Sequence, residues 1–503
     1  MTMTPQTNSH LLGVGARLKE APAEEMLDAA FAHEITDGPV LYRAMSLTDI
    51  AYAVMLCETN IVPHEDRAPL MRGLLALHAI PADAFPYDAA QGDIYQNREH
   101  RLQDLAERGS GWLRAGRARR ESSTVGYVIT VRANLLSLIG AVADLIGVLT
   151  ATAKDHLRTL MPDYTYLQKA HPTTLAHYLM GFTAPLLRDG ERLRAAYGRF
   201  NQCPAAIGSV NGSRLPLDRE RVAALLGFPS AVPHTRDAMW AADLAVEAAS
   251  ALMALMVTVD RLAEDLYIFA TEEFGYLTLA DAHSRISVIM PQKKNPYSLA
   301  FVRGVARHTL GVLNSVIATN LTPSGQPDNR LFAYGDLPRA LDAATKAIRL
   351  LAGAIRRADW DTDHMARRAG EGFSGATDLA DHLTEAAGLD PREAHKVVGY
   401  AVREAVSTGE RLITAAGLDF AAQATLGRAL NLPESEVLAA QDPVSIVHSR
   451  TGLGGAAPAR VAELVATAAE SHADLQWWAD SEQTRLEVAE TALMTVANRI
   501  AQG

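Results

Sequence analysis

The sequence predicts an all-α protein organised around a central bundle of long helices. Segments rich in Ala and Leu dominate it, and runs of β-branched residues that alternate at period two are few. Residues 132–157 form one such segment, in which Leu135, Leu138 and Val142 recur at helical spacing, and residues 241–274 form a longer one. Because small side chains let helix axes approach closely, we expect the two segments to pack in one tight bundle.

The order of these segments divides the chain into three expected domains. Residues 1–111 contain shorter helical stretches interrupted by prolines. The long segments fall within residues 112–369, which we expect to form the central bundle. A Gly-rich stretch, G-E-G-F-S-G, then leads into a C-terminal helical domain of residues 370–503.

The composition fits a large soluble protein, which we expect to be a cytoplasmic enzyme. With 503 residues and 48% hydrophobic content, the chain is able to bury substantial cores. A net charge of −11 argues against a nucleic-acid partner, which requires clustered Lys and Arg. Only Cys57 and Cys203 are present, which argues against a disulfide framework, and the first residues do not read as a secretory signal. Asp144 and Glu247 interrupt the best candidates for a membrane span, so we expect none.

The most informative local feature is the stretch S-V-I-M-P-Q-K-K-N-P at residues 287–296. It places the hydroxyl of Ser287 beside an amide-rich loop that carries Lys293 and is bounded by two prolines. A serine alkoxide needs nearby positive charge or N–H donors, which this loop supplies. The arrangement suits a site that holds a carboxylate while a proton leaves the neighbouring carbon. A loop serine in an ordinary turn is the alternative.

This stretch resembles the signature loop of the fumarase/aspartase superfamily, and its Q-K-K-N-P ending is similar to the argininosuccinate lyase branch. Further segments in matching order resemble the same branch: G-D-I-Y-Q-N-R-E (92–99), A-G-R-A-R-R-E-S (115–122), D-Y-T-Y-L-Q-K-A-H-P (163–172), A-T-D-L-A-D-H-L (376–383), P-R-E-A-H-K-V-V-G (391–399) and S-R-T-G-L-G-G-A-A-P (449–458). The resemblance implies a fumarase/aspartase-like three-domain fold. It also implies a homotetramer whose active sites combine residues 115–122, 163–172 and 284–298 from three subunits.

The resemblance also assigns roles to several residues. Ser287 matches the catalytic serine, which abstracts the proton next to the substrate carboxylate. Lys293 and Asn295 match positions that bind the substrate carboxylates, as a charge-assisted donor and an amide are suited to do. Thr165 matches a substrate-contacting threonine, and Gln168 matches a polar residue that supports it. Without the resemblance, either would be an ordinary residue near the end of a helix.

Other positions depart from the family pattern where the leaving group is expected. Tyr166 replaces a histidine that is a candidate proton donor, and Ala300 replaces the glutamate usually paired with that histidine. A buried carboxylate without its partner is costly, so the joint loss fits a pair that acts as a unit. Tyrosine, with a reference pKa of about 10, is a weaker acid than histidine. His171 is a candidate replacement, with a structural role as the alternative.

Two more departures concern substrate binding. Arg119 keeps a family arginine, but Arg120 replaces an asparagine that contacts substrate. The added guanidinium is suited to grip a carboxylate or to exclude a cationic substrate arm, and the alternative is that it swings to solvent. Gln326 replaces a tyrosine in a segment that receives the arginine end of the family's substrate.

These patterns predict a carbon–nitrogen lyase. We expect β-elimination from an N-substituted aspartate or a related succinyl compound, releasing fumarate or a fumarate-like acid, with a non-standard leaving group. One rival is argininosuccinate lyase proper, with Tyr166 or His171 as the acid, and the other is a non-catalytic scaffold of the same fold. The sequence shows neither metal-ligand spacing nor a nucleotide-binding glycine loop, and the elimination needs no cofactor.

Overall fold

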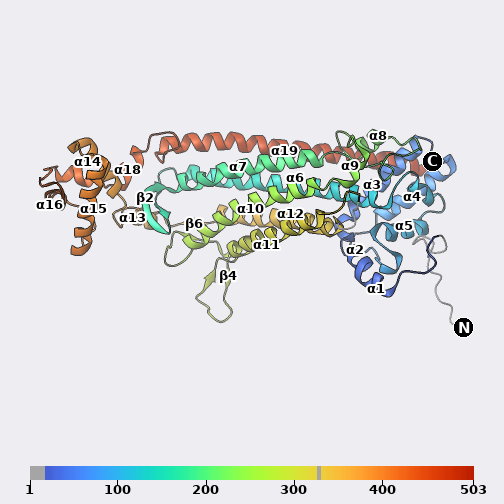
Figure 1. Ribbon diagram of the computed structural model, residues 1–503, viewed down its shortest axis with the longest axis horizontal. Coiled ribbons are helices and arrows are strands. Elements are labelled where there is room, and N and C mark those ends of the chain that lie inside the picture. The colour runs from blue at the N-terminus through green and yellow to red at the C-terminus, as the bar shows by residue number, and fades with distance from the viewer. Residues whose placement is uncertain (1–16, 326–329) are drawn as a thin grey trace.

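The computed structural model describes residues 17–325 and 330–503 and shows an elongated, almost entirely helical molecule (Figure 1). The predicted all-α fold class is confirmed. The long helices of the central bundle are α6 (Arg119–Asp155), α7 (Leu175–Phe200), α10 (Asp243–Phe269), α11 (Tyr297–Asn320), α12 (Leu331–Arg356) and α19 (Pro458–Gln502). Within the bundle, α6 packs against α7, α12 and α19, and α11 packs against α10 and α12.

The apolar stripes read from the sequence form the bundle core. Leu135, Leu138 and Val142 on α6 are each 0% exposed, as are Leu255 and Leu262 on α10. Helix α6 begins 13 residues before the expected segment, at Arg119. Its first turns are buried against the N-terminal helices, a tertiary contact that periodicity within one segment does not report.

The N-terminal part consists of shorter helices stacked against one end of the bundle (Figure 1). They are α1 (Glu24–Met26), a π-helical turn (Leu27–Phe31), α2 (Ala32–Thr36), α3 (Gly38–Glu58), α4 (His64–His78) and α5 (Ile94–Leu105), with 3-10 turns at Ala89–Gln91 and Ser110–Arg114. Two short helices follow α7 near this end: α8 (Arg219–Leu225) and α9 (Thr235–Trp240). Asp93 caps α5 by accepting a hydrogen bond from the Gln96 backbone, which fixes the entry of that helix.

The C-terminal region has two parts that pack in different hydrophobic cores. Helices α14 (Ala376–Ala387), α15 (Pro391–Thr408), α16 (Ala415–Leu426) and α17 (Glu434–Ala439) share a hydrophobic core of their own. They lie with α13 (Thr362–Ala369) and α18 (Pro443–Ser449) at the far end of the bundle (Figure 1). Helix α19 leaves this cluster and runs back along the bundle to α4, with Val461 and Ala497 in the main core.

The strands form short antiparallel pairs at the edges of the helices. They are β1 (Leu160–Thr165) with β2 (Gln168–Thr174), β3 (Leu277–Thr278) with β6 (Asp359–Trp360), and β4 (Arg285–Ile286) with β5 (Lys294–Asn295). A 3-10 turn, Asp281–His283, precedes β4. The β4–β5 hairpin projects sideways from the bundle and carries the 287–296 stretch at its tip (Figure 1).

Two helices, α3 and α6, are long and apolar enough by composition to cross a membrane. The most apolar stretches of these helices are 89% and 67% buried within the described fold. This burial accounts for their composition, because a helix that is apolar on most sides needs neighbours on most sides.

Candidate active site

The 287–296 stretch is a turn held by its own backbone. The Ser287 N–H donates to the Lys293 carbonyl at 3.2 Å, and the Lys293 N–H donates to the Met290 carbonyl at 3.0 Å. The Met290 N–H donates to Ser287 Oγ at 3.1 Å. An N–H donor aimed at this oxygen favours its anionic form, so the turn supplies one of the stabilising contacts that a serine base requires.

The polar side chains of this hairpin divide into anchoring and available groups. Asn295 Nδ2 donates to the Arg285 carbonyl at 3.0 Å, across the β4–β5 pair. Lys294 is ion-paired with Asp281 at 2.7 Å. Across residues 17–325 and 330–503, the Lys293 ammonium has no ion-pair partner, and the side chain is exposed. Lys293 is therefore the cation of this loop that remains open to a carboxylate ligand.

The tip of the hairpin is apolar and open to solvent in the single chain. Ile286, Val288 and Ile289 are 67%, 97% and 85% exposed, respectively. Exposed apolar side chains that lie together in this way are a common feature of interaction surfaces.

The β1–β2 hairpin presents the residues predicted from the 163–172 segment. Tyr166 and Leu167 form its tip with φ of +54° and +57°, a left-handed conformation that non-glycine residues adopt at a cost. Tyr166 is 98% exposed. Thr165 and Gln168 pair directly across the two strands, so their side chains lie close together. The register shifts between Pro162 and Tyr164, where the β2 strand holds an extra residue in the stretch that includes His171.

Arg119 and Arg120, at the start of α6, lie in an acidic surrounding. Arg120 forms a two-pronged contact with Glu34, at 2.9 and 3.1 Å, and lies 3.7 Å from Asp93. Burial lowers the pKa of the Arg120 guanidinium, but the carboxylates of Glu34 and Asp93 together raise it more, so the net direction is upward. Arg119 is 3.1 Å from Asp93, and 41% of its side chain is exposed. The Arg120 side chain is only 13% exposed and is not directed into solvent.

Two other residues of the 115–122 segment are structural. The buried Arg117 pairs with Asp49 at 2.8 Å and lies over the Tyr52 ring at 4.8 Å. Glu121 accepts a hydrogen bond from the Ala206 N–H at 2.6 Å, which ties α6 to the loop that follows α7. Burial raises the pKa of Glu121 to about 7.

Glu34 could not be identified from the sequence as part of this cluster. Its pairing with Arg120 joins residues 86 apart in the chain, and no local pattern marks such a contact. Asp93 does have a local signal, because it lies in the G-D-I-Y segment and has the spacing of a helix N-cap.

The chain does not bring all the predicted residues together. Arg119 and Arg120 lie where α6 begins, Ser287 and Lys293 lie on the projecting β4–β5 hairpin, and the β1–β2 hairpin lies farther toward the opposite end (Figure 1). Gln326 lies outside the described residues. No cluster of three or more His, Cys, Asp or Glu side chains is placed to hold a metal ion within the described residues.

Comparison with known proteins agrees with this architecture. Residues 21–311 match the Lyase family, and residues 373–448 match the argininosuccinate lyase C-terminal family. The argininosuccinate lyase of Methanosarcina acetivorans is 32% identical over 96% of this chain and 95% of its own length. That of Halobacterium salinarum is 36% identical over 86% of this chain and 87% of its own length. The crystal structure of EDDS lyase in complex with formate superposes with a TM-score of 0.85 at 29% identity, over 96% of this chain and 97% of that one.

A helical bundle carrying this serine loop, together with the match over more than half of the chain, defines the class of protein as a lyase. Within that class, the chain belongs to the argininosuccinate lyase-like branch of the fumarase/aspartase superfamily. It is an enzyme that breaks carbon–nitrogen bonds.

Proposed function

We propose that this lyase performs β-elimination on an N-substituted aspartate or a related succinyl compound whose amine is not that of argininosuccinate. The products are fumarate, or a fumarate-like acid, and the free amine. The observation that carries the proposal is an asymmetry within the candidate site. Ser287 and Lys293 are retained on a preorganised turn, whereas Tyr166, Ala300 and Arg120 replace the family residues expected at the amine side.

The elimination follows from the chemistry of these groups. Ser287 Oγ removes the proton from the carbon next to the carboxylate, and negative charge then develops on that carboxylate. Lys293 and backbone N–H groups stabilise this charge. Thr165, supported by Gln168, and the second amide N–H of Asn295, whose other N–H is bonded to the Arg285 carbonyl, position the substrate carboxylates. A proton must also reach the departing nitrogen, and Tyr166 or His171 donates it. EDDS lyase is a structural relative named for a different substrate, and a variant of it has been solved with bound fumarate. This supports the proposal that the substrates of these lyases share a succinyl half that leaves as fumarate.

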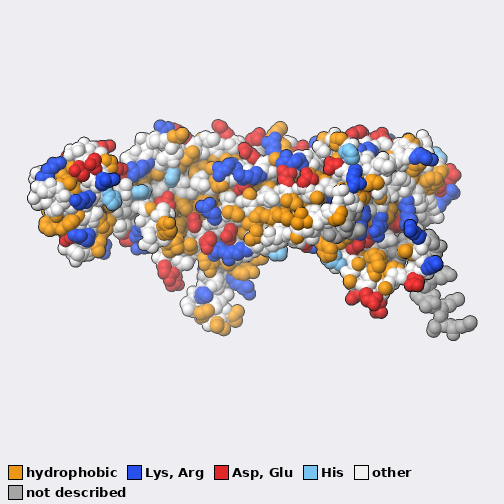
Figure 2. All heavy atoms as spheres, viewed as in Figure 1, with side chains coloured by type: hydrophobic (Ala, Val, Ile, Leu, Met, Phe, Trp, Pro, Cys, Tyr) orange, Lys and Arg blue, Asp and Glu red, His pale blue; other side chains and the backbone are white. Residues whose placement is uncertain are grey.

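We further propose that the enzyme works as a cytoplasmic homotetramer with shared active sites. Its three predicted site segments lie apart within one chain, so a complete site requires segments from other copies (Figure 1). The uncovered apolar tip at Val288 and Ile289 supports this assembly. Additional exposed apolar residues on the bundle include Val257, Phe301 and Leu310, and Figure 2 shows hydrophobic side chains in a band along it.

Argininosuccinate lyase proper is the second candidate. It is favoured by the relatives, since several that are 32–36% identical over most of the chain carry that name. In this case Tyr166 or His171 takes over the acid role toward a guanidino leaving group.

The two candidates are separated by measuring fumarate release from argininosuccinate and from a panel of N-substituted aspartates. We expect the purified enzyme to release fumarate faster from at least one panel member than from argininosuccinate. Brisk turnover of argininosuccinate alone would refute the non-standard substrate. Ser287→Ala lowers any such turnover at least ~100-fold, as expected for loss of the base. Ser250→Ala, which removes a hydroxyl bonded only within α10, is the matched control.

A further inference from the structure

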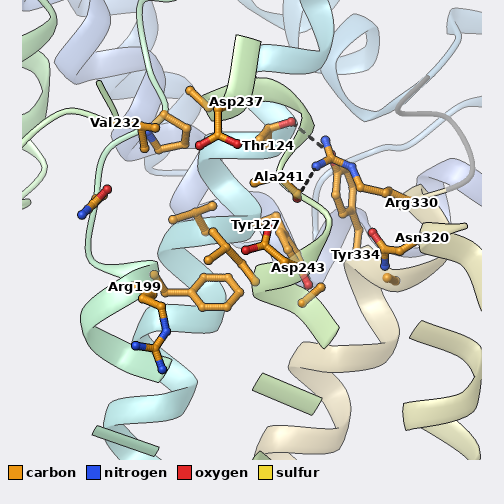
Figure 3. Close-up of a pocket in the computed structure, with 18 residues that line it drawn as sticks. Thr124, Tyr127, Arg199, Val232, Asp237, Ala241, Asp243, Asn320, Arg330 and Tyr334 are labelled. Atoms are coloured by element: carbon orange, nitrogen blue, oxygen red, sulfur yellow. Dashed lines mark hydrogen bonds between the residues drawn. The ribbon is translucent and has the colours of Figure 1, made fainter. Parts of the chain in front are cut away.

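A cavity lies inside the single chain, at the end of the bundle near the start of α6 (Figure 3). Its volume is about 140 Å³, and its walls come from α6, α7, α9, α10, α11 and α12. An apolar cavity of about 150 Å³ is enough to hold benzene, so this space admits a six-membered ring that carries a charged group at the cavity edge.

One wall of the cavity is aromatic. The rings of Tyr127 and Tyr334 are stacked with centroids 4.8 Å apart, and Phe200 meets Tyr127 edge-on at 6.4 Å. Burial raises the pKa of the Tyr127 hydroxyl, so this group stays neutral at physiological pH. Faces of this kind attract cations as well as apolar groups.

Buried polar atoms in the walls are left without partners. Tyr127 is 7% exposed and Asn320 is 9% exposed. Within residues 17–325 and 330–503, neither the Tyr127 hydroxyl nor Asn320 Oδ1 has a hydrogen-bond partner. The Asn320 Nδ2 group, by contrast, donates to the Val316 carbonyl at 2.7 Å. An unpaired buried acceptor costs about 1–3 kcal/mol, and a ligand carrying N–H donors relieves that cost.

The charges around the cavity favour a cation. Asp237 and Asp243 stand at its edge, around the same space as Tyr127 and Asn320 (Figure 3). The described part of the chain supplies no ion pair to either carboxylate. Arg199 is neutralised by a two-pronged contact with Glu247, and Arg330 donates to the carbonyls of Ala241 and Met239 at 2.9 and 2.6 Å. Two carboxylates against the Arg330 charge leave a net charge of −1.

The cavity adjoins the arginine cluster at the start of α6. Tyr334 lines both the cavity and the crevice that contains Arg120, Glu34 and Asp93. Thr124 lies one helical turn beyond Arg120 on α6 and is 3.1 Å from the Tyr334 hydroxyl, Oγ to oxygen. Tyr334 is therefore a wall that the crevice and the cavity share, and the two spaces are neighbours in the fold.

We propose that this cavity binds a small organic amine in its protonated form, with a compact aromatic or aliphatic body, and that this amine is the group released by the lyase. The ammonium lies between Asp243 and the acceptors of Asn320 and Tyr127, and its body lies against the tyrosine rings. The binding of the amine stands on the cavity alone, whereas its assignment as the leaving group rests on the proposed function.

The first test measures binding without turnover. Calorimetric titration of the full-length enzyme with benzylamine, in the absence of any acid, is expected to show saturable binding at least ten times tighter than that of benzyl alcohol. Asp243→Asn and Asn320→Leu each weaken benzylamine binding at least tenfold. Asp342→Asn, on the exposed face of α12, is the matched control and leaves binding unchanged. Thermal unfolding of each variant verifies that it is folded.

The second test links the cavity to the reaction. In the reverse direction, the addition of benzylamine and other small amines to fumarate is expected to show a KM for the amine at least tenfold higher in Asp243→Asn, with the KM for fumarate within twofold. The inference is overturned if Asp243→Asn changes the KM for the amine and the KM for fumarate equally, or if neither Asp243→Asn nor Asn320→Leu changes benzylamine binding. Either outcome leaves the proposed elimination standing. Binding that depends on Asp243, with no addition of any amine to fumarate, instead overturns the leaving-group assignment together with the proposed function.

Discussion

The contact between Arg120 and Glu34 allows a stability prediction that also bears on the site. We consider Glu34→Gln, which keeps the shape of the side chain and removes its charge. The two side chains are 13% and 12% exposed, and the guanidinium meets both carboxylate oxygens, at 2.9 and 3.1 Å. Removing one member of a buried ion pair costs about 3–5 kcal/mol, because the other charge is left uncompensated. Asp93, 3.7 Å away, compensates for part of it, so we expect a loss of about 2–3 kcal/mol in the free energy of unfolding.

The chain offers a matched control for this measurement. Arg221 and Glu58 form the same two-pronged geometry, at 2.7 and 2.8 Å, but each side chain is 37% exposed. For Glu58→Gln we expect about 0–1 kcal/mol, as is usual for pairs at the surface. Urea unfolding of both variants gives the two losses in the free energy of unfolding, provided that the dependence of this free energy on urea concentration has the same slope in each variant. Losses for Glu34→Gln and Glu58→Gln that agree within ~0.5 kcal/mol would refute the argument that burial makes the Arg120 contact strong.

Three further predictions concern pH, catalysis and assembly. Burial raises the pKa of Glu121 to about 7, so ionising it in the folded state costs stability as pH rises from about 5 to 8. Glu121→Gln removes about 2.5 kcal/mol of this decline, read from the urea midpoints at about pH 5 and pH 8. A variant whose stability falls with pH as much as that of the parent contradicts the assignment. Tyr166→Phe lowers kcat at least ~100-fold and His171→Gln less than ~10-fold in steady-state elimination assays, and the opposite ranking makes His171 the acid. If the enzyme is the proposed tetramer, Val288→Asp dissociates it in sedimentation experiments at matched concentration, and a variant that stays tetrameric shows that the hairpin tip lies outside the interface.

The central helices could be predicted because their signal is local. Each turn of α6 and α10 repeats the same apolar stripe, and burial of Leu135 and Leu255 follows from that repetition. The path of α19 could not be predicted in this way. Its own periodicity identifies a helix, but its return along α6 to α4 depends on surfaces several hundred residues earlier in the chain.

The candidate site also has a part with a local sequence signal and a part that depends on contacts between distant segments. The turn around Ser287 could be predicted, because its proline, lysine and serine residues are consecutive and its hydrogen bonds close within the stretch. The surroundings of Arg120 could not, since Glu34 reaches it from a different helix. Neither alternative considered for Arg120 from the sequence, a carboxylate grip or a swing to solvent, included an internal partner.

This internal partner bears on which arginine meets the substrate. A substrate carboxylate that binds Arg120 in the same two-pronged way has to displace Glu34. Glu34 is already held in place by the fold, so it loses little conformational entropy when it keeps its two hydrogen bonds. A diffusing dicarboxylate has no such advantage at equal geometry. Arg119 is different, because 41% of its side chain is exposed and its contact with Asp93 is a single one at 3.1 Å. We therefore propose that Arg119, rather than Arg120, binds a substrate carboxylate, and that Arg120 forms a fixed wall of the crevice beside Tyr334.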